Sequence, residues 1–161
     1  MKDNDIWLTP PNLLNVLGKF DLDPCAPMKR LWPTAKHHYT EKENGLIKPW
    51  FGRVWCNPPY SEGKIWTNKF LDHANGLILM SATSPGSPWL QRILKETDGV
   101  FFFKRKLKFY FPNSIQGRAY LYNLLGAIGK KNLIILKQLP QHGFDGVLMY
   151  SSESARSKHK F

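Results

Sequence analysis

The residues best suited to chemistry are the run Asn57-Pro58-Pro59-Tyr60, which follows the apolar stretch 53–56. The side-chain oxygen of Asn57 and the backbone carbonyl of Pro58 could each accept a hydrogen bond from an exocyclic amine, such as the 6-amino group of adenine. Two prolines fix φ at successive positions, so the carbonyl direction is set in advance. The Tyr60 ring offers a face on which a base rotated out of its helix could stack.

Such an arrangement would localise the lone pair of a weakly nucleophilic amine and prepare it for alkylation. The same four residues are also typical of an ordinary turn at the end of a strand. Their position directly after a strand-like run in a basic chain favours the functional interpretation.

The elements that must position this motif alternate between strands and helices. Apolar runs predict strands at 20–23, 53–56, 76–80, 100–103, 106–111, 120–128 and 146–150. Helical spacing predicts helices at 64–74, 88–96 and 130–139, and a first helix that is capped by Thr9 and ends at Gly18. The run 120–128 also fits a helical period, although a strand is preferred. Alternation of this kind predicts an α/β sheet with helices on both faces and ligands at the carboxyl ends of its strands.

Composition predicts one domain, at residues 1–150, with a basic tail at 151–161. The chain has 161 residues and a formal net charge of +11. Residues 101–161 contain 11 basic and 2 acidic residues, which favours a nucleic-acid partner over a merely soluble surface. No apolar run approaches the roughly 18 residues of a membrane span, and no secretory segment is visible, so we expect an intracellular, cytoplasmic protein without a membrane partner.

A basic segment at 104–111 alternates cations with apolar residues. In a strand its lysines would share one face, either to contact phosphates or to protect a sheet edge from association. The candidate nucleic-acid-binding residues are Lys104, Arg105, Lys106 and Lys108.

Neither a disulfide framework nor a metal site is expected. The two cysteines, Cys25 and Cys56, stand in a chain of intracellular character. Their spacing around His37 and His38 matches no compact zinc pattern.

Taken in order, several segments resemble the phage-type DNA N-6-adenine methyltransferases, which use S-adenosylmethionine. These segments are Trp7-Leu8-Thr9-Pro10, Leu22-Asp23-Pro24-Cys25-Ala26, Asn44-Gly45-Leu46, and residues 49–61, which include Asn-Pro-Pro-Tyr. The resemblance implies a Rossmann-like methyltransferase fold: a mixed, mostly parallel sheet with helices on both faces. It also implies methylation of a flipped adenine in double-stranded DNA.

The resemblance assigns roles by position. Asn57, Pro58, Pro59 and Tyr60 would form the catalytic pocket. The cofactor would be held by Asp23, Pro24 and Ala26 after the first strand, by Thr9 and Pro10 at its methionine portion, and by Asn44 at its adenosine portion. Trp7 is a candidate wall of the cofactor pocket only because it is close to Thr9 and Pro10 in the sequence.

One departure from the family is that residues 23–28 lack the glycines that many relatives have after the first strand. This departure slightly favours one alternative function, which is nucleic-acid binding by a protein that has lost catalysis. A second alternative is methylation of RNA or of the cytosine amine, because the same pocket chemistry would serve any exocyclic amine.

Overall fold

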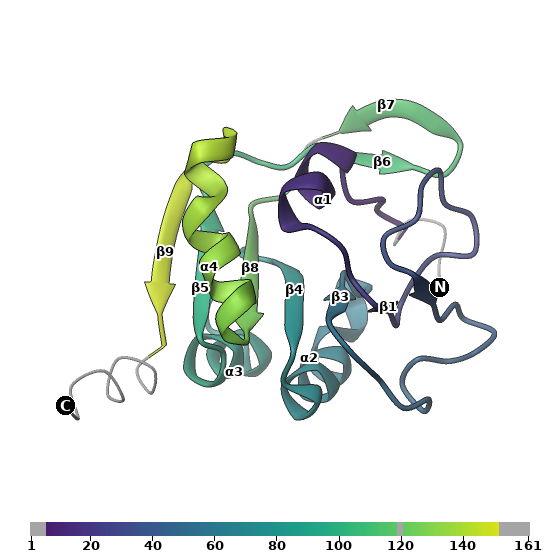
Figure 1. The fold of residues 1–161 in the computed structure, drawn as a ribbon, viewed down its shortest axis with the longest axis horizontal. Coiled ribbons are helices and arrows are strands. Elements are labelled where there is room, and N and C mark those ends of the chain that lie inside the picture. Colours follow the sequence, from purple (N-terminus) through teal and green to yellow (C-terminus); the bar gives the residue numbers. More distant parts are fainter. Residues whose placement is uncertain (1–5, 119–120, 152–161) are drawn as a thin grey trace.

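The computed structural model describes residues 6–118 and 121–151. Figure 1 shows a central sheet flanked by helices, with a two-stranded hairpin beside the amino-terminal segment. In chain order the elements are α1 (Pro11–Leu17), β1 (Leu22–Asp23), β2 (His37–His38), β3 (Val54–Cys56), η2 (Tyr60–Glu62), α2 (Gly63–His73), β4 (Gly76–Ser81), α3 (Pro88–Glu96), β5 (Gly99–Phe103), β6 (Phe109–Phe111), β7 (Ser114–Arg118), β8 (Asn123–Ile128), α4 (Lys130–Gln138), η3 (Leu139–His142) and β9 (Gly146–Tyr150).

The main sheet has the strand order β2-β1-β3-β4-β8-β5-β9. Strands β2, β1, β3 and β4 are parallel to one another, whereas β8 is antiparallel to both β4 and β5, and β9 is antiparallel to β5. The sheet is therefore mixed, and the prediction of a mostly parallel sheet is wrong when judged by strand pairing. The physical reason is that the chain passes from β5 to β8 through the β6–β7 hairpin and not through the crossover helix that a parallel neighbour requires.

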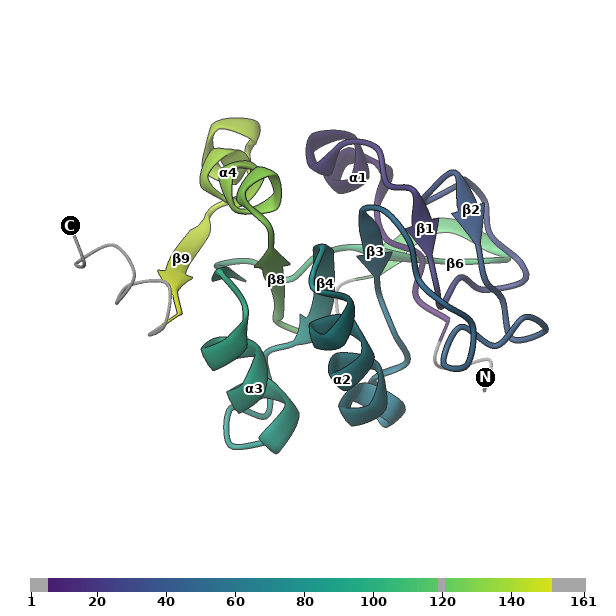
Figure 2. The ribbon, with the colours of Figure 1, turned by 60° about the horizontal axis from the view of Figure 1, so that its bottom comes forward.

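Helices cover the sheet on both sides, as Figure 2 shows: α1 and α4 lie on one face, and α2 and α3 lie on the other. Successive side chains of β4 point to opposite faces. Leu77 and Leu79 join the core beneath α1 and α4, and Ile78 and Met80 join the core beneath α2 and α3. This two-sided burial explains why β4 is a continuous apolar run instead of an alternating one.

The order of the strands creates a place for a ligand. From β1 the chain moves to β2 on one side and then returns to β3 on the other side of β1. Loops that leave β1 and β3 therefore diverge at the carboxyl edge of the sheet, which is where open α/β sheets bind ligands. The predicted chemical motifs follow these two strands.

Several sequence-based expectations need correction. The segment 106–111 is a strand only at Phe109–Phe111, so Lys104, Arg105, Lys106 and Lys108 do not lie on the face of a strand. Thr9 does not cap α1, because Pro10 occupies the N-cap position. Strand β2, at His37–His38, and the pairing of β6 with β7 were not predicted.

Other expectations concern the tail, membranes and metals. Residues 152–161 of the predicted tail and residue 120 lie outside the described residues. No helix in the described part of the chain is long and apolar enough to cross a membrane. Within the same residues no cluster of three or more His, Cys, Asp or Glu side chains is placed to hold a metal ion.

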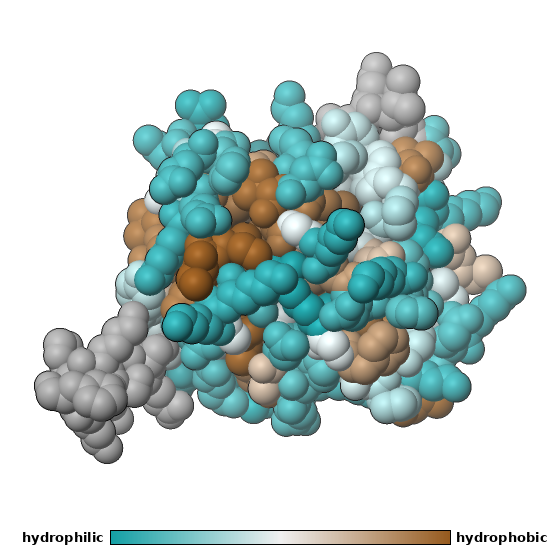
Figure 3. All heavy atoms as spheres, in the orientation of Figure 1, coloured by the Kyte–Doolittle hydropathy of each residue, from teal (hydrophilic) through white to brown (hydrophobic). Residues whose placement is uncertain are grey.

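Figure 3 shows hydrophilic side chains over much of one face of the molecule, with hydrophobic residues gathered where α4 and β9 lie. The exposed apolar side chains in these two elements are Ile134, Val147, Met149 and Tyr150. The predicted site lies at the other end of the sheet, around β1 and β3.

Candidate active site

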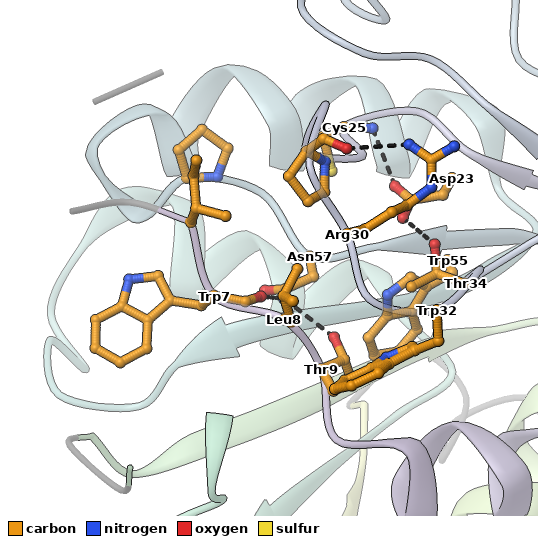
Figure 4. A pocket seen from close by; sticks show the side chains of 13 residues that line it. Trp7, Leu8, Thr9, Asp23, Cys25, Arg30, Trp32, Thr34, Trp55 and Asn57 are labelled. Atoms are coloured by element: carbon orange, nitrogen blue, oxygen red, sulfur yellow. Dashed lines mark hydrogen bonds between the residues drawn. The ribbon is translucent and has the colours of Figure 1, made fainter. Parts of the chain in front are cut away.

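Two polar side chains from the ends of neighbouring strands face a narrow pocket. Asp23 ends β1 and Asn57 follows β3, and both line the pocket together with Thr9, Trp32 and Thr34 (Figure 4). The free space is only about 20 Å³, enough for roughly one water molecule. The structure thus brings together two residues predicted for different roles, one catalytic and one in cofactor binding.

The side chain of Asn57 is held at one end only. Its Nδ2 donates to the carbonyl oxygen of Trp7 at 2.9 Å and to Thr9 Oγ1 at 3.1 Å. A carbonyl oxygen can only accept, so the amide NH₂ must face Trp7 and the orientation of the amide is fixed. Among the described residues none donates a hydrogen bond to Asn57 Oδ1, so this oxygen can accept one from a substrate.

The segment that holds Asn57 is itself well anchored. Leu8 forms two backbone hydrogen bonds with Tyr110 of β6, at 2.9 and 3.1 Å. Trp32 Nε1 donates to the carbonyl oxygen of Thr9 at 3.0 Å, and the Trp7 ring packs against Phe109 and Phe111, also from this hairpin. The sequence predicts a cofactor role for Thr9 and Trp7, and in the structure they orient the Asn57 amide.

Tyr60 begins η2 directly after Pro58 and Pro59. Its hydroxyl oxygen accepts a hydrogen bond from Asn123 Nδ2 at 2.8 Å, and burial raises the pKa of this phenol. Asn123 is 1% exposed and begins β8. Sequence analysis missed this residue, and the only indication was a polar side chain at the start of the apolar run Asn123-Leu124-Leu125.

Asp23 is a buried carboxylate with two hydrogen-bond donors. Oδ1 accepts from the backbone N–H of Cys25 at 3.1 Å, and Oδ2 accepts from the hydroxyl of Thr34. The side chain is 3% exposed, and desolvation raises its pKa to about 6, even though both hydrogen bonds act in the opposite direction. Near neutral pH this site therefore contains a mostly ionised carboxylate in a poorly solvated position, which suits a cationic or hydrogen-bond-donating ligand.

A much larger cavity adjoins the narrow pocket. Its volume is about 500 Å³, within the range of roughly 300–1,000 Å³ that is common for small-molecule and cofactor sites. Cys25 and Pro59 border both cavities. Of the residues predicted to bind a cofactor, Pro24, Ala26 and Asn44 line this larger cavity.

One wall of the large cavity is the loop that contains Asn44 and Gly45. A Cβ atom on Gly45 would lie 1.8 Å from the carbonyl oxygen of Pro24, so only glycine fits here. Lys69 Nζ donates to the carbonyl oxygens of Leu46 at 2.6 Å and Lys48 at 2.7 Å. Asn44 has a φ of 54°, and its Oδ1 accepts from Leu46 N at 3.1 Å. The Asn44 oxygen is thus used to form the turn.

The basic segment borders a third cavity, of about 420 Å³. Arg105, Lys106 and Lys108 line it, whereas Lys104 does not, and all four side chains are exposed. Pro10, predicted at the cofactor, lines this third cavity and neither of the other two. Lys106 Nζ lies 5.3 Å from the ring centroid of Tyr122.

The buried Cys25 borders the first two cavities, and Cys56 lies next to it. Their Sγ atoms are 3.9 Å apart, and both residues are free thiols. Cys25 and Cys56 thus fill space between the loops that leave β1 and β3.

Comparison with known proteins agrees with this geometry. A family model described as DNA N-6-adenine-methyltransferase (Dam) matches residues 1–139, which include every element around the narrow pocket. A DNA N-6-adenine-methyltransferase of Escherichia phage T1 is 30% identical over 126 residues, which are 72% of this chain and 50% of that protein. The chain thus spans about half the length of this curated relative. No solved structure matches. The chain belongs to the DNA N-6-adenine-methyltransferase (Dam) family.

Proposed function

We propose that this protein transfers a methyl group from S-adenosylmethionine to the 6-amino nitrogen of adenine in DNA. The observation that carries the proposal is the one-sided tethering of Asn57. Its NH₂ group is fixed by Trp7 and Thr9, so Oδ1 is presented as an acceptor before any substrate arrives. Preorganised acceptors of this kind stabilise the positive charge that develops on an attacking amine.

In this proposal the protein acts on the amine, not on the methyl donor. Asn57 Oδ1 and the Pro58 carbonyl oxygen accept one hydrogen bond each from the two amine N–H groups, and the nitrogen lone pair is directed away from the base ring. When bound, S-adenosylmethionine supplies an electrophilic methyl group on a positively charged sulfur. After the N–C bond forms and the S–C bond breaks, the methylated nitrogen loses one proton to solvent, so no covalent enzyme intermediate is needed.

The residues present fit this cofactor. The cavity of about 500 Å³ lined by Pro24, Ala26 and Asn44 is large enough for much of a nucleoside-sized ligand. The ionised, buried Asp23 lines the adjoining narrow pocket and would face a cationic part of the cofactor that reaches into it. Gly45 supports the same assignment, because its close approach to Pro24 provides the tight backbone packing that the glycine-free loop 23–28 cannot provide.

The sheet supports a Rossmann-like assignment. Strands β4 and β5 run in the same direction because both are antiparallel to β8, so β8 is a reversed strand inserted into an otherwise parallel set from β2 to β5. The two proposed ligand loops leave β1 and β3, where the strand order changes direction.

The target base requires movement of the pocket lining. A purine does not fit in a space of about 20 Å³, so a flipped adenine reaches Asn57 only when a lining segment is displaced. One candidate is the part of the lining that contains Pro27, Arg30, Trp32 and Thr34, which lies between β1 and β2 outside any helix or strand. The energetic cost of base flipping would be offset by stacking on Tyr60 and by phosphate contacts at Arg105, Lys106 and Lys108.

The decisive experiment incubates the purified protein with methyl-labelled S-adenosylmethionine and unmethylated duplex DNA, followed by digestion to nucleosides. We expect label in N6-methyladenine, and with Asn57→Ala a loss of roughly 100-fold or more in labelled product. Label in 4-methylcytosine, or in RNA but not DNA, would replace adenine in DNA as the substrate. DNA binding without any labelled product or cofactor binding would identify a non-catalytic nucleic-acid-binding protein.

A further inference from the structure

His38 folds back onto the loop that precedes it. Its Nε2 accepts hydrogen bonds from the backbone N–H groups of Thr34 at 3.2 Å and Ala35 at 3.3 Å. A ring nitrogen that receives two donors must carry a lone pair, so the imidazole is neutral and holds its proton on Nδ1. The sequence singled out His37 and His38 only as a pair without metal partners, and the site described above leaves His38 without a role.

The loop closed by His38 delivers Thr34 to the narrow pocket. The Thr34 hydroxyl donates to Asp23 Oδ2, and Figure 4 shows this contact beside the Arg30 side chain. His38 is paired with Asp23 in the register between β2 and β1, and the backbone N–H of Tyr39 donates to the carbonyl oxygen of Asp23 at 2.8 Å. The position of the carboxylate therefore depends on both the strand pairing and the loop.

We propose that Thr34 and His38 are positioning residues for the cofactor, which act by fixing the Asp23 carboxylate so that its remaining lone pairs face a positively charged part of S-adenosylmethionine. The inference deepens the proposed function and rests on it. Asp23 has one oxygen bound by Cys25 N and the other by Thr34, so loss of the Thr34 hydroxyl frees the carboxylate to rotate. Loss of the His38 acceptor frees the loop that carries this hydroxyl.

The charges around His38 favour its neutral form. Burial lowers the pKa of His38, and the positive charges of Arg30 and His37 lower it further. Arg30 lies in the same loop as Thr34, and His37 precedes His38 in β2. The carboxylate of Asp23 in β1 is bound to the Thr34 hydroxyl. Protonated Nε2 would become a donor directed at two other donors, which would open the loop, so the arrangement is intact at neutral pH.

The test is a double-mutant cycle read by calorimetric titration with S-adenosylmethionine. Thr34→Val keeps the shape but removes the donor, and we expect its dissociation constant to rise by about 10-fold, the effect of one hydrogen bond to a charged group. Thr34→Ser retains the hydroxyl and should stay within about 2-fold of wild type. In an Asp23→Asn background, Thr34→Val should cause no further weakening, because a positioning residue has nothing left to position.

His38→Phe, which keeps a ring but loses the acceptor, should weaken binding as Thr34→Val does, and the two changes together should not add. Turnover at saturating cofactor should change less than the dissociation constant.

Wild-type affinity in Thr34→Val, or equal weakening in both Asp23 backgrounds, would overturn the inference. Thermal melting identifies any variant that is merely unfolded. If Thr34→Val is unfolded, the affinity of Thr34→Ser decides, and an affinity far below wild type would then overturn the inference. If the wild-type protein itself does not bind S-adenosylmethionine, the proposed function fails first, which is a distinguishable result.

Discussion

The NH₂ group and the oxygen of the Asn57 side chain have different roles in the proposed site. The NH₂ end is bound to Trp7 and Thr9, and in the proposed reaction the oxygen accepts a hydrogen bond from the substrate amine. A carboxylate at the same place could accept hydrogen bonds from a substrate but could not donate to the Trp7 carbonyl, which would face a second acceptor at about the present 2.9 Å. In the proposed reaction, a side chain at position 57 must therefore both accept a hydrogen bond from the substrate and donate one to the Trp7 carbonyl oxygen.

This asymmetry predicts the order of activity in two variants. Asn57→Ala should lower single-turnover methyl transfer by roughly 100- to 1,000-fold, as loss of a preorganised polar contact does elsewhere. The transfer rate of Asn57→Asp should lie between those of Asn57→Ala and wild type, because aspartate keeps an acceptor oxygen but loses the hydrogen bond that orients it. Calorimetry with the cofactor is the control and should be nearly unchanged in both. Full activity in Asn57→Asp would show that the tether to Trp7 is unimportant.

Asp23 predicts a dependence of stability on pH. Its pKa is raised from 3.8 to about 6 by burial, so the folded state binds this proton more tightly than the unfolded state, and stability decreases as pH rises through that interval. An asparagine side chain at this position carries no charge at any pH. Asp23→Asn should therefore unfold at higher urea than wild type near pH 8, by an amount of free energy up to the order of 3 kcal/mol, and the difference should shrink near pH 4.

The same substitution should also weaken cofactor binding, so that stability and function change in opposite directions. Urea titrations at the two pH values, together with calorimetry at the higher one, measure both effects. A variant that is less stable than wild type near pH 8 would mean that the hydrogen bonds from Thr34 and Cys25 outweigh the cost of desolvation.

At this scale the sequence predicted residue types better than their partners. Asn57 and Asp23 were recognisable because each follows an apolar strand, and the structure places both on one pocket. The partners were not recognisable, because Trp7 is 50 residues from Asn57 and Asn123 is 63 residues from Tyr60. Every residue has a backbone carbonyl, so a contact with the Trp7 carbonyl oxygen cannot be recognised from the type of residue at position 7.

At the scale of elements, the loop from Thr40 to Trp50 is fitted onto the loop that follows β1. Trp50 Nε1 donates to the carbonyl oxygen of Gly45 at 2.8 Å, and Lys69 ties the next residues to α2. A loop without regular structure thus forms a defined wall of the largest cavity near the motifs. Its shape depends on the absence of a side chain at Gly45.

Gly45→Ala should therefore disturb this wall. The new Cβ would meet the Pro24 carbonyl oxygen at 1.8 Å, and the loop must shift at a cost of about 1–3 kcal/mol of folding free energy. The melting temperature and the cofactor affinity should both fall. Gly86→Ala is the matched control, since a Cβ there has no atom within 4 Å. Equal effects of the two substitutions would remove the special role of Gly45.

The elements themselves were predictable where one physical rule dominates. Buried runs such as Gly76–Ser81 and helical spacing such as that of Trp66 and Phe70 both led to the correct element. Strand β2 was missed because His37 and His38 are held by backbone pairing with β1, with no apolar pattern. The segment 104–108 was wrongly extended into a strand because alternate burial, with Leu107 buried between exposed lysines, also occurs in an irregular chain.

At the scale of the whole molecule, charge and site are arranged on the same end of the fold. The exposed cations that line the third cavity precede β6, and β6 is bonded to Leu8 next to the Asn57 tether. Nucleic acid held along the basic segment would therefore lie close to the chemical groups. The net charge of +11 alone would attract a polyanion to any part of the surface.

The dependence of DNA affinity on salt separates these two effects. A variant with Arg105→Gln, Lys106→Gln and Lys108→Gln should reduce the slope of log affinity against log salt by about 2–3, close to one per lost phosphate contact. The control variant, Lys64→Gln, Lys95→Gln and Lys131→Gln, removes the same charge from other exposed positions and should leave the slope nearly unchanged. Equal changes in both would indicate attraction by net charge without a defined surface.

The two backbone hydrogen bonds between Leu8 and Tyr110 imply that the proposed catalytic motif depends on residues outside Asn57–Tyr60. The chain before α1 supplies the carbonyl and hydroxyl groups that keep the Asn57 amide from rotating, and the hairpin keeps that chain in place. A shortened protein that started after Thr9 would retain an intact Asn-Pro-Pro-Tyr sequence. It would lose the two hydrogen-bond acceptors that fix the orientation of the Asn57 amide.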